Sequence, residues 1–483
     1  MKGLILQKFG FAPTKEQEKA VLGMAEFVMQ HTDEEIFVLR GYAGTGKTSL
    51  VGALVAALDA LQQSCVLLAP TGRAAKVFSG YAAHKAFTIH RRIYRQKSFD
   101  GDTACFGQGI NTAKNTLFIV DEASMVTGDA LGDGGSSALS FGTGRLLDDL
   151  VHFVYNGRGC RLLLVGDAAQ LPPVGTCESP ALDRSVLEGY GLVVREASLT
   201  QVVRQMSDSG ILYNATLLRR CLLDDDVYAL PVMQLQGFAD IVAVPAGELL
   251  EMLDDSYRCC GEDGTIIVTR SNVRALLYNE GIRARVLYYD EELCSGEQLM
   301  VVKNNYFWLD EGEEDEALTA GAAPTEAPFI ANGDTCILRR YRNERSEHGF
   351  RFVDAILVFP DYDNTEVEAT LLLDTLHAQS PALTREQQRE LFQHVWDDYP
   401  EYTNKRDRMK AVRRDPFFNA LQVKYAYAVT CHKAQGGQWP HVYIDQGMIT
   451  EDMLGPDYYR WLYTAITRAT QKVFLINYQA PMT

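Results

Sequence analysis

A glycine-rich segment near the N-terminus has the residue types and spacing that hold a chain of phosphates. The segment Gly41-Tyr42-Ala43-Gly44-Thr45-Gly46-Lys47-Thr48 fits G-x-x-x-x-G-K-[ST] at every defined position. Glycines let backbone N–H groups curl round phosphate oxygens, and the N-terminus of a following helix adds positive potential. We therefore predict an ATP site in which Lys47 reaches the β- and γ-phosphates and Thr48 binds Mg²⁺. The residues predicted to contact the nucleotide here are Gly41, Ala43, Gly44, Thr45, Gly46, Lys47, Thr48 and Ser49.

An acidic pair, Asp121-Glu122, follows the apolar segment at 117–120. Carboxylates at the end of a buried strand are where a protein of this kind holds Mg²⁺ and activates water. We expect Asp121 to bind the metal, directly or through water, and Glu122 to act as general base. The alternative is that the pair caps the start of a helix.

Three more side chains are candidates for contact with the γ-phosphate. Gln170 lies in Gly166-Asp167-Ala168-Ala169-Gln170-Leu171-Pro172-Pro173, a loop that its prolines stiffen. Arg204 and Arg468 each offer a rigid set of donors to the charge that spreads over phosphoryl oxygens in a transition state. The alternatives are a plain rigid turn for Gln170 and surface ion pairs for the arginines.

Short apolar segments alternate with helical ones at both ends of the chain, which is typical of parallel sheets covered by helices. Strands are expected at 36–40, 65–70, 117–120 and 161–165, and again at 265–269, 424–430, 441–445 and 472–477. Helices are expected at 47–61, 144–156, 272–285 and 456–466. The fold class is therefore α/β, with two parallel-sheet domains.

The middle of the chain, about 300–420, has a different pattern. Its apolar and polar residues alternate as in antiparallel strands, and a polar, helix-rich stretch follows from Thr384. We expect a small β-domain with a helical insert at 384–415. Residues 128–144 form a glycine- and serine-rich loop, and residues 310–328 form an acidic, then Ala- and Pro-rich linker.

Composition narrows the class of protein. The 483 residues are 47% hydrophobic and 23% charged, and no apolar segment reaches the about 18 residues that a membrane helix needs. The ten cysteines form no C-x-x-C, which favours free thiols and a cytoplasmic location over a metal cluster. A net charge of −17 excludes a uniformly basic nucleic-acid binder but not a local basic groove. Basic residues cluster at 91–97 and 405–414, where a solvated surface is the simpler interpretation.

Seven segments in order resemble the motifs of superfamily 1 helicases, and most of all the 5′-to-3′ branch of RecD-like, Dda-like and PIF-type enzymes. They are GYAGTGKT, APTGRAAK, VDEAS, GDAAQLPPVG, LTQVVRQ, VTCHKAQG and LYTAITRA, and the resemblance covers about 14–470.

The resemblance implies two RecA-like P-loop NTPase domains with ATP between them, a β-hairpin (pin) insertion and a small SH3-like β insertion. The expected domains are 1–90 with 117–190 (RecA-like domain 1), 91–116 (pin), 191–295 with 420–483 (RecA-like domain 2) and 296–419 (SH3-like insertion with the acidic linker and helical insert). It also implies that Gln17 reads adenine, that Gln170 senses phosphate, and that Arg204 and Arg468 touch the γ-phosphate.

Contacts to nucleic acid are also implied by the resemblance. The residues concerned are Thr71, Arg73, Lys76, His90, Phe99, Thr430, His432 and Lys433. Hydroxyls and amines at such positions hold phosphates whatever the bases are. Helix capping by Thr71 and a structural role for His432 are the alternatives.

Tyr94, Phe99 and Phe106 are the candidates for an aromatic wedge that splits the duplex. Ala434 stands where relatives often have serine, so one phosphate contact is expected to be missing.

The expected function is thus a DNA-stimulated ATPase and helicase that moves 5′ to 3′ on single-stranded DNA and unwinds forked duplex DNA. The first alternative is a translocase subunit of a nuclease–helicase complex. The second is a nucleotide-switched DNA-binding module that does not unwind. Expected partners are DNA, ATP and Mg²⁺, with a single-strand-binding or nuclease protein possible and no membrane. Repair, recombination, replication support and a mobile element are all compatible with this function.

Overall fold

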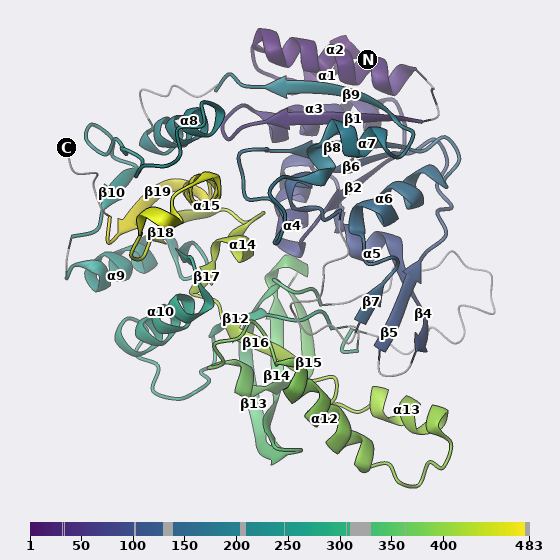
Figure 1. Cartoon of the computed structure of the whole chain (residues 1–483), viewed down its shortest axis with the longest axis vertical. Coiled ribbons are helices and arrows are strands. Elements are labelled where there is room, and N and C mark those ends of the chain that lie inside the picture. The colour runs from purple at the N-terminus through teal and green to yellow at the C-terminus, as the bar shows by residue number, and fades with distance from the viewer. Residues whose placement is uncertain are drawn as a thin grey trace.

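The N-terminal third folds into a six-stranded parallel sheet with the strand order β3-β2-β6-β8-β1-β9 (Figure 1). Successive residues of its strands point into different cores, with Ile36 and Val38 on one face and Phe37 and Leu39 on the other. Burial on both faces is why these segments are apolar without alternation. The strands are β1 (Glu35–Gly41), β2 (Cys65–Ala69), β3 (Ala86–Thr88), β6 (Leu117–Val120), β8 (Arg161–Gly166) and β9 (Val193–Leu199).

The coordinates come from a computed structural model, which describes residues 1–30, 32, 34–100, 103–128, 139–202, 209–245, 247–305, 307–309, 330–362 and 364–478. For 96–100, 103–106 and 139–141 only the backbone is described.

Helices cover both faces of this sheet. One core joins the sheet to α1 (Lys2–Phe9), α2 (Lys15–Met29), α3 (Lys47–Ala60) and α4 (Gly72–Ala82). The core on the other face contains residues of α5 (Ile89–Ile93), α6 (Leu146–Tyr155) and α7 (Arg184–Glu188). The 3₁₀ turn η1 (Ala123–Met125) follows β6, and the 3₁₀ turn η2 (Pro180–Leu182) precedes α7.

The predicted end of the first domain at residue 190 is wrong. Strand β9 pairs in parallel with β1, from Glu35 opposite Val193 to Gly41 opposite Leu199, so the first sheet continues to Leu199. β9 is an edge strand and its side chains alternate between buried and exposed, which is why it lacks the continuous apolar run of its neighbours.

The second parallel sheet has the order β10-β19-β18-β11-β17. Its strands are β10 (Ile241–Ala243), β11 (Thr265–Thr269), β17 (Ala428–Thr430), β18 (Trp439–Asp445) and β19 (Ala469–Ile476). Its helices are α8 (Gly210–Leu223), α9 (Leu249–Cys260), α10 (Asn272–Arg285), α14 (Cys431–Ala434) and α15 (Pro456–Ile466), with the 3₁₀ turn η5 (Glu451–Met453). Both predicted helices, at 272–285 and 456–466, are confirmed.

A closed β-barrel lies below the two parallel sheets in Figure 1. Its strands are β12 (Gln298–Val301), β13 (Thr335–Glu347), β14 (Phe350–Phe359), β15 (Thr365–Leu372) and β16 (Leu421–Tyr425), and its 3₁₀ turns are η3 (Pro360–Tyr362) and η4 (Leu373–Thr375). The helical insert is α12 (Arg385–Asp397) and α13 (Lys405–Arg413), and it has a core of its own against the barrel. The likeness of this barrel to an SH3 domain stays a prediction.

The strand predicted at 424–430 is two strands of different domains. Leu421–Tyr425 closes the barrel as β16, and Ala428–Thr430 is β17 of the second sheet. The predicted boundary at 419–420 is therefore wrong, because the chain passes from one sheet to the other within a few apolar residues that the pattern reads as continuous.

A three-stranded sheet projects from the first domain at the position predicted for the hairpin. It contains β4 (Tyr94–Asp100), β5 (Thr103–Gln108) and β7 (Leu139–Phe141). β7 comes from the end of the glycine-rich loop and pairs in parallel with β5. The rest of that loop, at 129–138, and the acidic linker lie outside the described residues. Among the helices that are described, none has the length and apolarity to cross a bilayer.

Candidate nucleotide site and nucleic-acid interface

The glycine-rich loop joins β1 to α3 and has the backbone that its glycines permit. Gly44 and Gly46 have φ angles of 75° and 82°, which is the left-handed region that favours glycine. A Cβ on Gly41 would lie 2.6 Å from Cγ of Lys47, so the lysine crosses directly over this residue. The Lys47 ammonium donates to the carbonyl of Tyr42 at 3.0 Å. The loop thus presents its backbone amides and Lys47 at the mouth between β1 and α3.

Asp121 and Glu122 stand at the carboxyl end of β6, beside the loop. Asp121 Oδ1 accepts the backbone N–H of Glu122 at 2.9 Å, and Glu122 has a left-handed φ of 51°. Burial, and then the charge of Glu122, raise the pKa of Asp121, while the nearby Lys47 opposes the rise. A hydroxyl and a carboxylate are the hard oxygen donors that Mg²⁺ prefers, so Thr48 and Asp121 fit the predicted metal site. Glu122 starts η1, so the capping alternative describes its position in the chain, although its side chain makes no capping hydrogen bond.

Arg468 reaches across from the second domain to this acidic pair. Its guanidinium Nη1 lies 3.8 Å from Oε1 of Glu122, and the side chain is 4% exposed. The carbonyls of Thr464 and Gly437 accept from Nε and Nη1 at 3.1 and 3.3 Å and fix its orientation. Arg468 is therefore not a surface ion-pair residue, because it is buried where the two domains meet.

Two residues that the sequence analysis did not single out, Asp167 and Tyr463, complete the contact between the domains. Asp167 is buried, and its Oδ2 lies 3.8 Å from Nζ of Lys47. The hydroxyl of Tyr463 donates to the same oxygen at 2.7 Å and accepts the backbone N–H of Ala43 at 2.9 Å. Both residues stand inside the quoted segments GDAAQLPPVG and LYTAITRA. The sequence does not indicate that Asp167 and Tyr463 lie side by side, because 296 positions separate them.

Gln170 is buried in the loop after β8, and its Oε1 has no hydrogen-bond partner among the described residues. The next residue binds the second domain twice: the N–H of Leu171 donates to Thr464 Oγ1 at 2.9 Å, and its carbonyl accepts from Gln435 Nε2 at 2.8 Å. The loop that carries Gln170 is therefore a direct link between the domains. A buried amide that lacks a partner is consistent with contact to a ligand and goes beyond a plain rigid turn.

Gln17 is in a different setting from the one predicted. It is the third residue of α2, where its Oε1 accepts the N–H of Thr14 and its Nε2 donates to the carbonyl of Thr45 at 3.0 Å. The side chain thus braces the phosphate loop at the Thr45 carbonyl. Contact with adenine stays a prediction and requires Gln17 to use its remaining donor or to exchange these bonds. Arg204 lies outside the described residues.

The residues predicted to hold DNA from the first domain are already engaged. The hydroxyl of Thr71 caps α4 by accepting from Ala74 N, as its structural alternative proposed. The guanidinium of Arg73 stacks 4.0 Å from the ring centre of Trp439 in the second domain. Lys76 donates to the carbonyl of Pro360 at 2.8 Å and pairs with Asp361 at 2.9 Å, both in η3 of the barrel.

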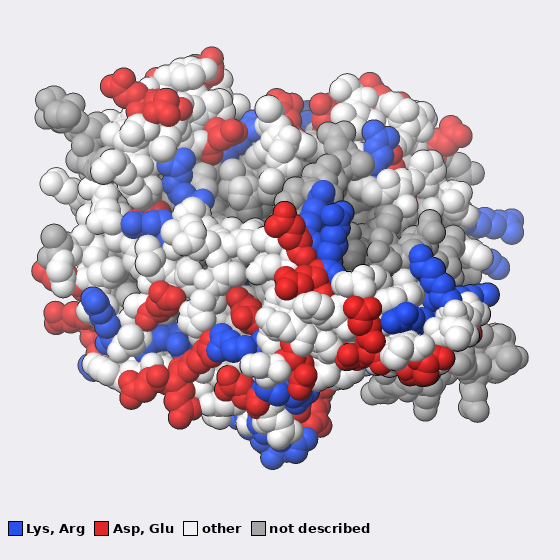
Figure 2. Space-filling view, turned by 60° about the horizontal axis from the view of Figure 1, so that its bottom comes forward, with Lys and Arg blue, Asp and Glu red and all other residues white. Residues whose placement is uncertain are grey.

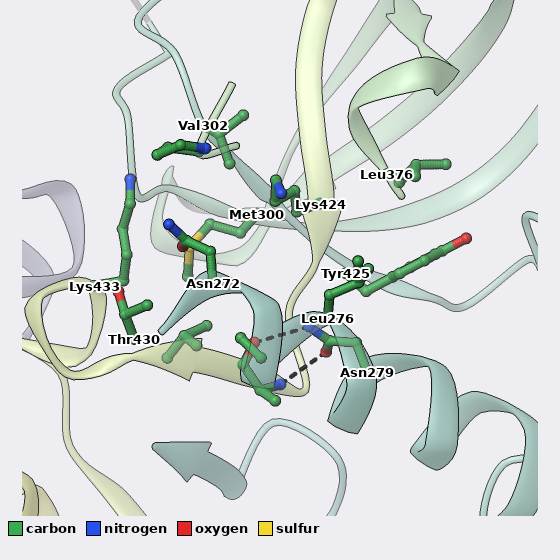
Figure 3. A pocket seen from close by; sticks show the side chains of 14 residues that line it. Asn272, Leu276, Asn279, Met300, Val302, Leu376, Lys424, Tyr425, Thr430 and Lys433 are labelled. Atoms are coloured by element: carbon green, nitrogen blue, oxygen red, sulfur yellow. Dashed lines mark hydrogen bonds between the residues drawn. The ribbon is translucent and has the colours of Figure 1, made fainter. Parts of the chain in front are cut away.

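The residues from the second domain face the barrel. Thr430 and Lys433 line a pocket between α10, β17 and the barrel, and Figure 3 shows Lys433 extended along one side of it. Lys433 donates to Asn332 in the turn before β13, and burial lowers its pKa to about 8. His432 is exposed and, among the described residues, makes no hydrogen bond, which does not fit the structural role given as its alternative. Ala434 is fully buried, so no side chain there faces a phosphate.

His90 and the aromatic candidates stand apart from this interface. His90 is half-buried in α5, and desolvation lowers its pKa to about 4, so it is neutral. Tyr94 is wrong as a wedge, because it is buried and donates to Asp149 at 2.7 Å. Phe99 lies in β4, one residue before the strand ends, but its side chain and that of Phe106 are not described.

Basic and acidic side chains are mixed over one face of the molecule (Figure 2). On the face shown in Figure 2, Lys and Arg side chains form small groups separated by acidic ones, with no continuous basic surface. The cations predicted to hold nucleic acid lie instead at the junction of α4, α14 and the barrel.

A phosphate loop that meets a buried arginine from a second parallel-sheet domain defines a P-loop NTPase built from two RecA-like domains. Two family models match the chain: the AAA domain over residues 14–133 and the UvrD-like helicase C-terminal domain over residues 425–476. In these segments, and in those shared with the relatives described next, the chain is similar to superfamily 1 helicases of the RecD-like and Pif-like kind.

Curated relatives match only part of the chain. The ATP-dependent RecD2 DNA helicase of Deinococcus radiodurans is 30% identical over 204 residues, which are 42% of this chain and 24% of that protein. The ATP-dependent DNA helicase PIF7 of Trypanosoma brucei brucei is 29% identical over 188 residues, which are 34% of this chain and 17% of that protein. The matches thus span about a quarter or less of these two relatives.

Solved structures of Pif1 helicases align over most of the chain at low identity. Pif1 from Bacteroides in complex with ADP-AlF3 and ssDNA is 15% identical with a TM-score of 0.47, covering 98% of this chain and 94% of that one. Pif1 from Candida albicans is 16% identical with a TM-score of 0.39, covering 97% and 96%.

Proposed function

We propose that this chain is an ATP-driven DNA helicase that moves 5′ to 3′ along single-stranded DNA and separates forked duplexes. The observation that carries the proposal is Arg468 of one domain lying 3.8 Å from Glu122 of the other, on the rim that holds Lys47. A switch that only binds nucleotide needs no second-domain arginine beside its general base. The 5′-to-3′ direction rests on the family resemblance alone.

The first step is capture of ATP by the phosphate loop. Lys47 exchanges its contacts with Asp167 and the Tyr42 carbonyl for the β- and γ-phosphates, and the loop amides bind phosphate oxygens. Thr48 and Asp121 would hold Mg²⁺, and the ion would supply positive charge that offsets the charge of the phosphates. Gln17, in its present position, keeps the Thr45 turn of the loop in shape.

Hydrolysis needs a proton acceptor for water and positive charge on the γ-phosphate. Glu122 takes the proton, because it is the carboxylate beside Asp121 whose side chain stays partly exposed and lies 3.8 Å from Arg468. Arg468 is already buried and oriented, so it stabilises the transferring phosphoryl group at little further entropic cost. Donors of this kind contribute about 10³–10⁵ in rate.

Translocation follows because Arg468 and the loop that carries Gln170 both join the two domains. The distance between the domains therefore depends on whether ATP is bound. ATP draws Arg468 toward the phosphate loop, and product release lets it part. Lys76 on one domain and Lys433 on the other then hold the strand in turn. Both lysines are bonded to the barrel here, so phosphates of the strand compete with Asp361 and Asn332 for them.

The decisive test is unwinding of labelled forks that carry a 5′ or a 3′ single-stranded tail, with ATP hydrolysis measured on the same samples. We expect hydrolysis stimulated by single-stranded DNA and unwinding only from the 5′ tail. Unwinding only in the presence of a nuclease partner identifies a translocase subunit. Binding of DNA without turnover identifies a nucleotide-switched module, and either result overturns the proposal.

A further inference from the structure

A cluster of metal-binding side chains lies on the second domain, away from the nucleotide cleft. Cys259, Cys260 and His441 each offer a ligand atom, and the three atoms lie within 4.8 Å of one another. The two cysteines end α9, and the histidine is in β18, 181 positions further along the chain than Cys260. The mechanism proposed above uses none of them.

Helix and strand periodicity explain why these side chains meet. Along α9, Met252, Ser256 and Cys260 follow at steps of four residues, so they share the face that packs against β18, and the exposed Cys259 lies beside this face. Along β18, His441 and Tyr443 are two residues apart and therefore share one face of the strand. A site on two regular elements of one domain is held more firmly than one on loops.

A chain of hydrogen bonds fixes the proton on the imidazole. The hydroxyl of Tyr443 donates to the carbonyl of Met252 at 2.5 Å, which uses its only proton. Ser256 Oγ, 2.7 Å away, must then donate to Tyr443, so Nδ1 of His441 donates to Ser256 at 2.9 Å. This leaves Nε2 of a neutral imidazole with its lone pair free. A partner that fixes the tautomer in this way is the usual second layer of a metal site.

The ligand set by itself gives a neutral complex. Two thiolates and one imidazole around a divalent cation give no net charge. Thiolate and imidazole together select zinc over the oxygen-preferring Mg²⁺.

We propose that Cys259, Cys260 and His441 bind one Zn²⁺ ion, with water in the fourth position. On binding, two Zn–S bonds form, both thiols lose their protons to solvent, and Nε2 adds its lone pair. The ion links the end of α9 to β18. Cys259 is exposed, so the site is open to solvent.

The test uses the full chain, freed of metal and kept reduced, titrated with Zn²⁺ against a chromophoric chelator. We expect one tightly held Zn²⁺ per chain, lost in the double variant Cys259→Ser/Cys260→Ser and weakened at least about 10-fold in His441→Asn. Ser256→Ala should weaken it about 10- to 100-fold, because the tautomer is no longer fixed. Co²⁺ bound to the unaltered chain should show thiolate charge-transfer absorption.

Matched controls separate this site from others. Asp59, Cys65 and His84 form the second group of potential ligands among the described residues, and Cys65→Ser should change nothing. Cys177→Ser tests an exposed thiol elsewhere. Melting of the metal-free variants checks their folding. The proposal is overturned if the unaltered chain holds no Zn²⁺, or if binding is the same in the double variant, or if it is lost in Cys65→Ser.

Discussion

At the scale of single residues, groups of the phosphate loop that would bind ATP already have partners within the protein. ATP must displace these partners to bind. Lys47 has a carbonyl and Asp167 as partners, and the Ala43 amide has the Tyr463 hydroxyl. Burial and the charge of Asp167 raise the pKa of Tyr463 well above its ordinary range. Tyr463 therefore keeps its proton and can both donate to Asp167 and accept from Ala43.

Lys47→Ala should abolish ATP hydrolysis, because no other cation of the loop reaches the β- and γ-phosphates. Binding of single-stranded DNA at low salt should be largely unchanged, since Lys76 and Lys433 are untouched. Steady-state ATPase assays and fluorescence anisotropy measure the two effects. Normal turnover in this variant would refute the nucleotide site.

Arg468→Ala should lower kcat for ATP hydrolysis by about 10³-fold or more with only a modest loss of ATP affinity, because the arginine acts on the transition state. Arg258→Ala is a suitable control, since its side chain is 74% exposed at the far end of α9. Equal rates in the two variants would mean that Arg468 only joins the domains.

Lys433 gives the interface a pH dependence. Its pKa of about 8 is low because of burial, and a bound phosphate favours the protonated amine, so DNA binding takes up a proton above pH 8. Affinity for single-stranded DNA should then fall by up to about tenfold per pH unit as pH rises above 8. Lys433→Arg should reduce this fall, because a guanidinium stays charged. A profile identical to that of the unaltered chain would show that Lys433 does not contact the strand.

At the scale of elements, the barrel is docked on α4. A Cβ on Gly72 would lie 2.3 Å from Oδ1 of Asp334 and 2.9 Å from the hydroxyl of Tyr362. The glycine in APTGRAAK is therefore required by the approach of the barrel. Asp334 is buried, and desolvation raises its pKa to about 7, while Tyr362 and the Ala331 amide donate to its other oxygen.

Asp361→Asn should strengthen binding of single-stranded DNA by about two- to fivefold at low salt, because it frees Lys76 from a partly exposed ion pair worth up to about 1 kcal/mol. Fluorescence anisotropy measures this. Glu366→Gln removes an exposed ion pair elsewhere on the barrel, with Arg339, and should have no effect. Weaker binding in Asp361→Asn would instead mean that the docked barrel helps to hold the strand.

At the scale of the whole molecule, the proposed function requires a chain of net charge −17 to bind a polyanion through a few cations on two domains. Log affinity for single-stranded DNA should fall linearly with log salt, by about 0.7 for each phosphate neutralised. Lys76→Ala and Lys433→Ala should each reduce the slope by about 0.7, and the double variant by about 1.4, because the two lysines belong to different domains. A flat salt response would contradict a grip on the backbone.

Much of the fold was predictable, because parallel strands buried on both faces must be apolar throughout. The central strands β1, β6, β8 and β11 and the helices between them therefore stand out in the sequence. The errors fell at β9 and β16, an edge strand and a strand that closes the barrel. β9 lacks the continuous apolar residues of the parallel sheet to which it belongs. β16 reads as continuous with β17, although it belongs to the barrel.

The sequence by itself identified the phosphate loop from its spacing, and it made the acidic pair and Arg468 candidates whose roles stay predictions. Only the tertiary structure decided which of them meet: Arg468 with Glu122, Tyr463 with Asp167, and Lys76 with the barrel. It also set the Gln17 side chain against the Thr45 carbonyl and placed Cys259 and Cys260 beside His441. Contacts between residues hundreds of positions apart depend on how whole sheets pack, and no local spacing records that packing.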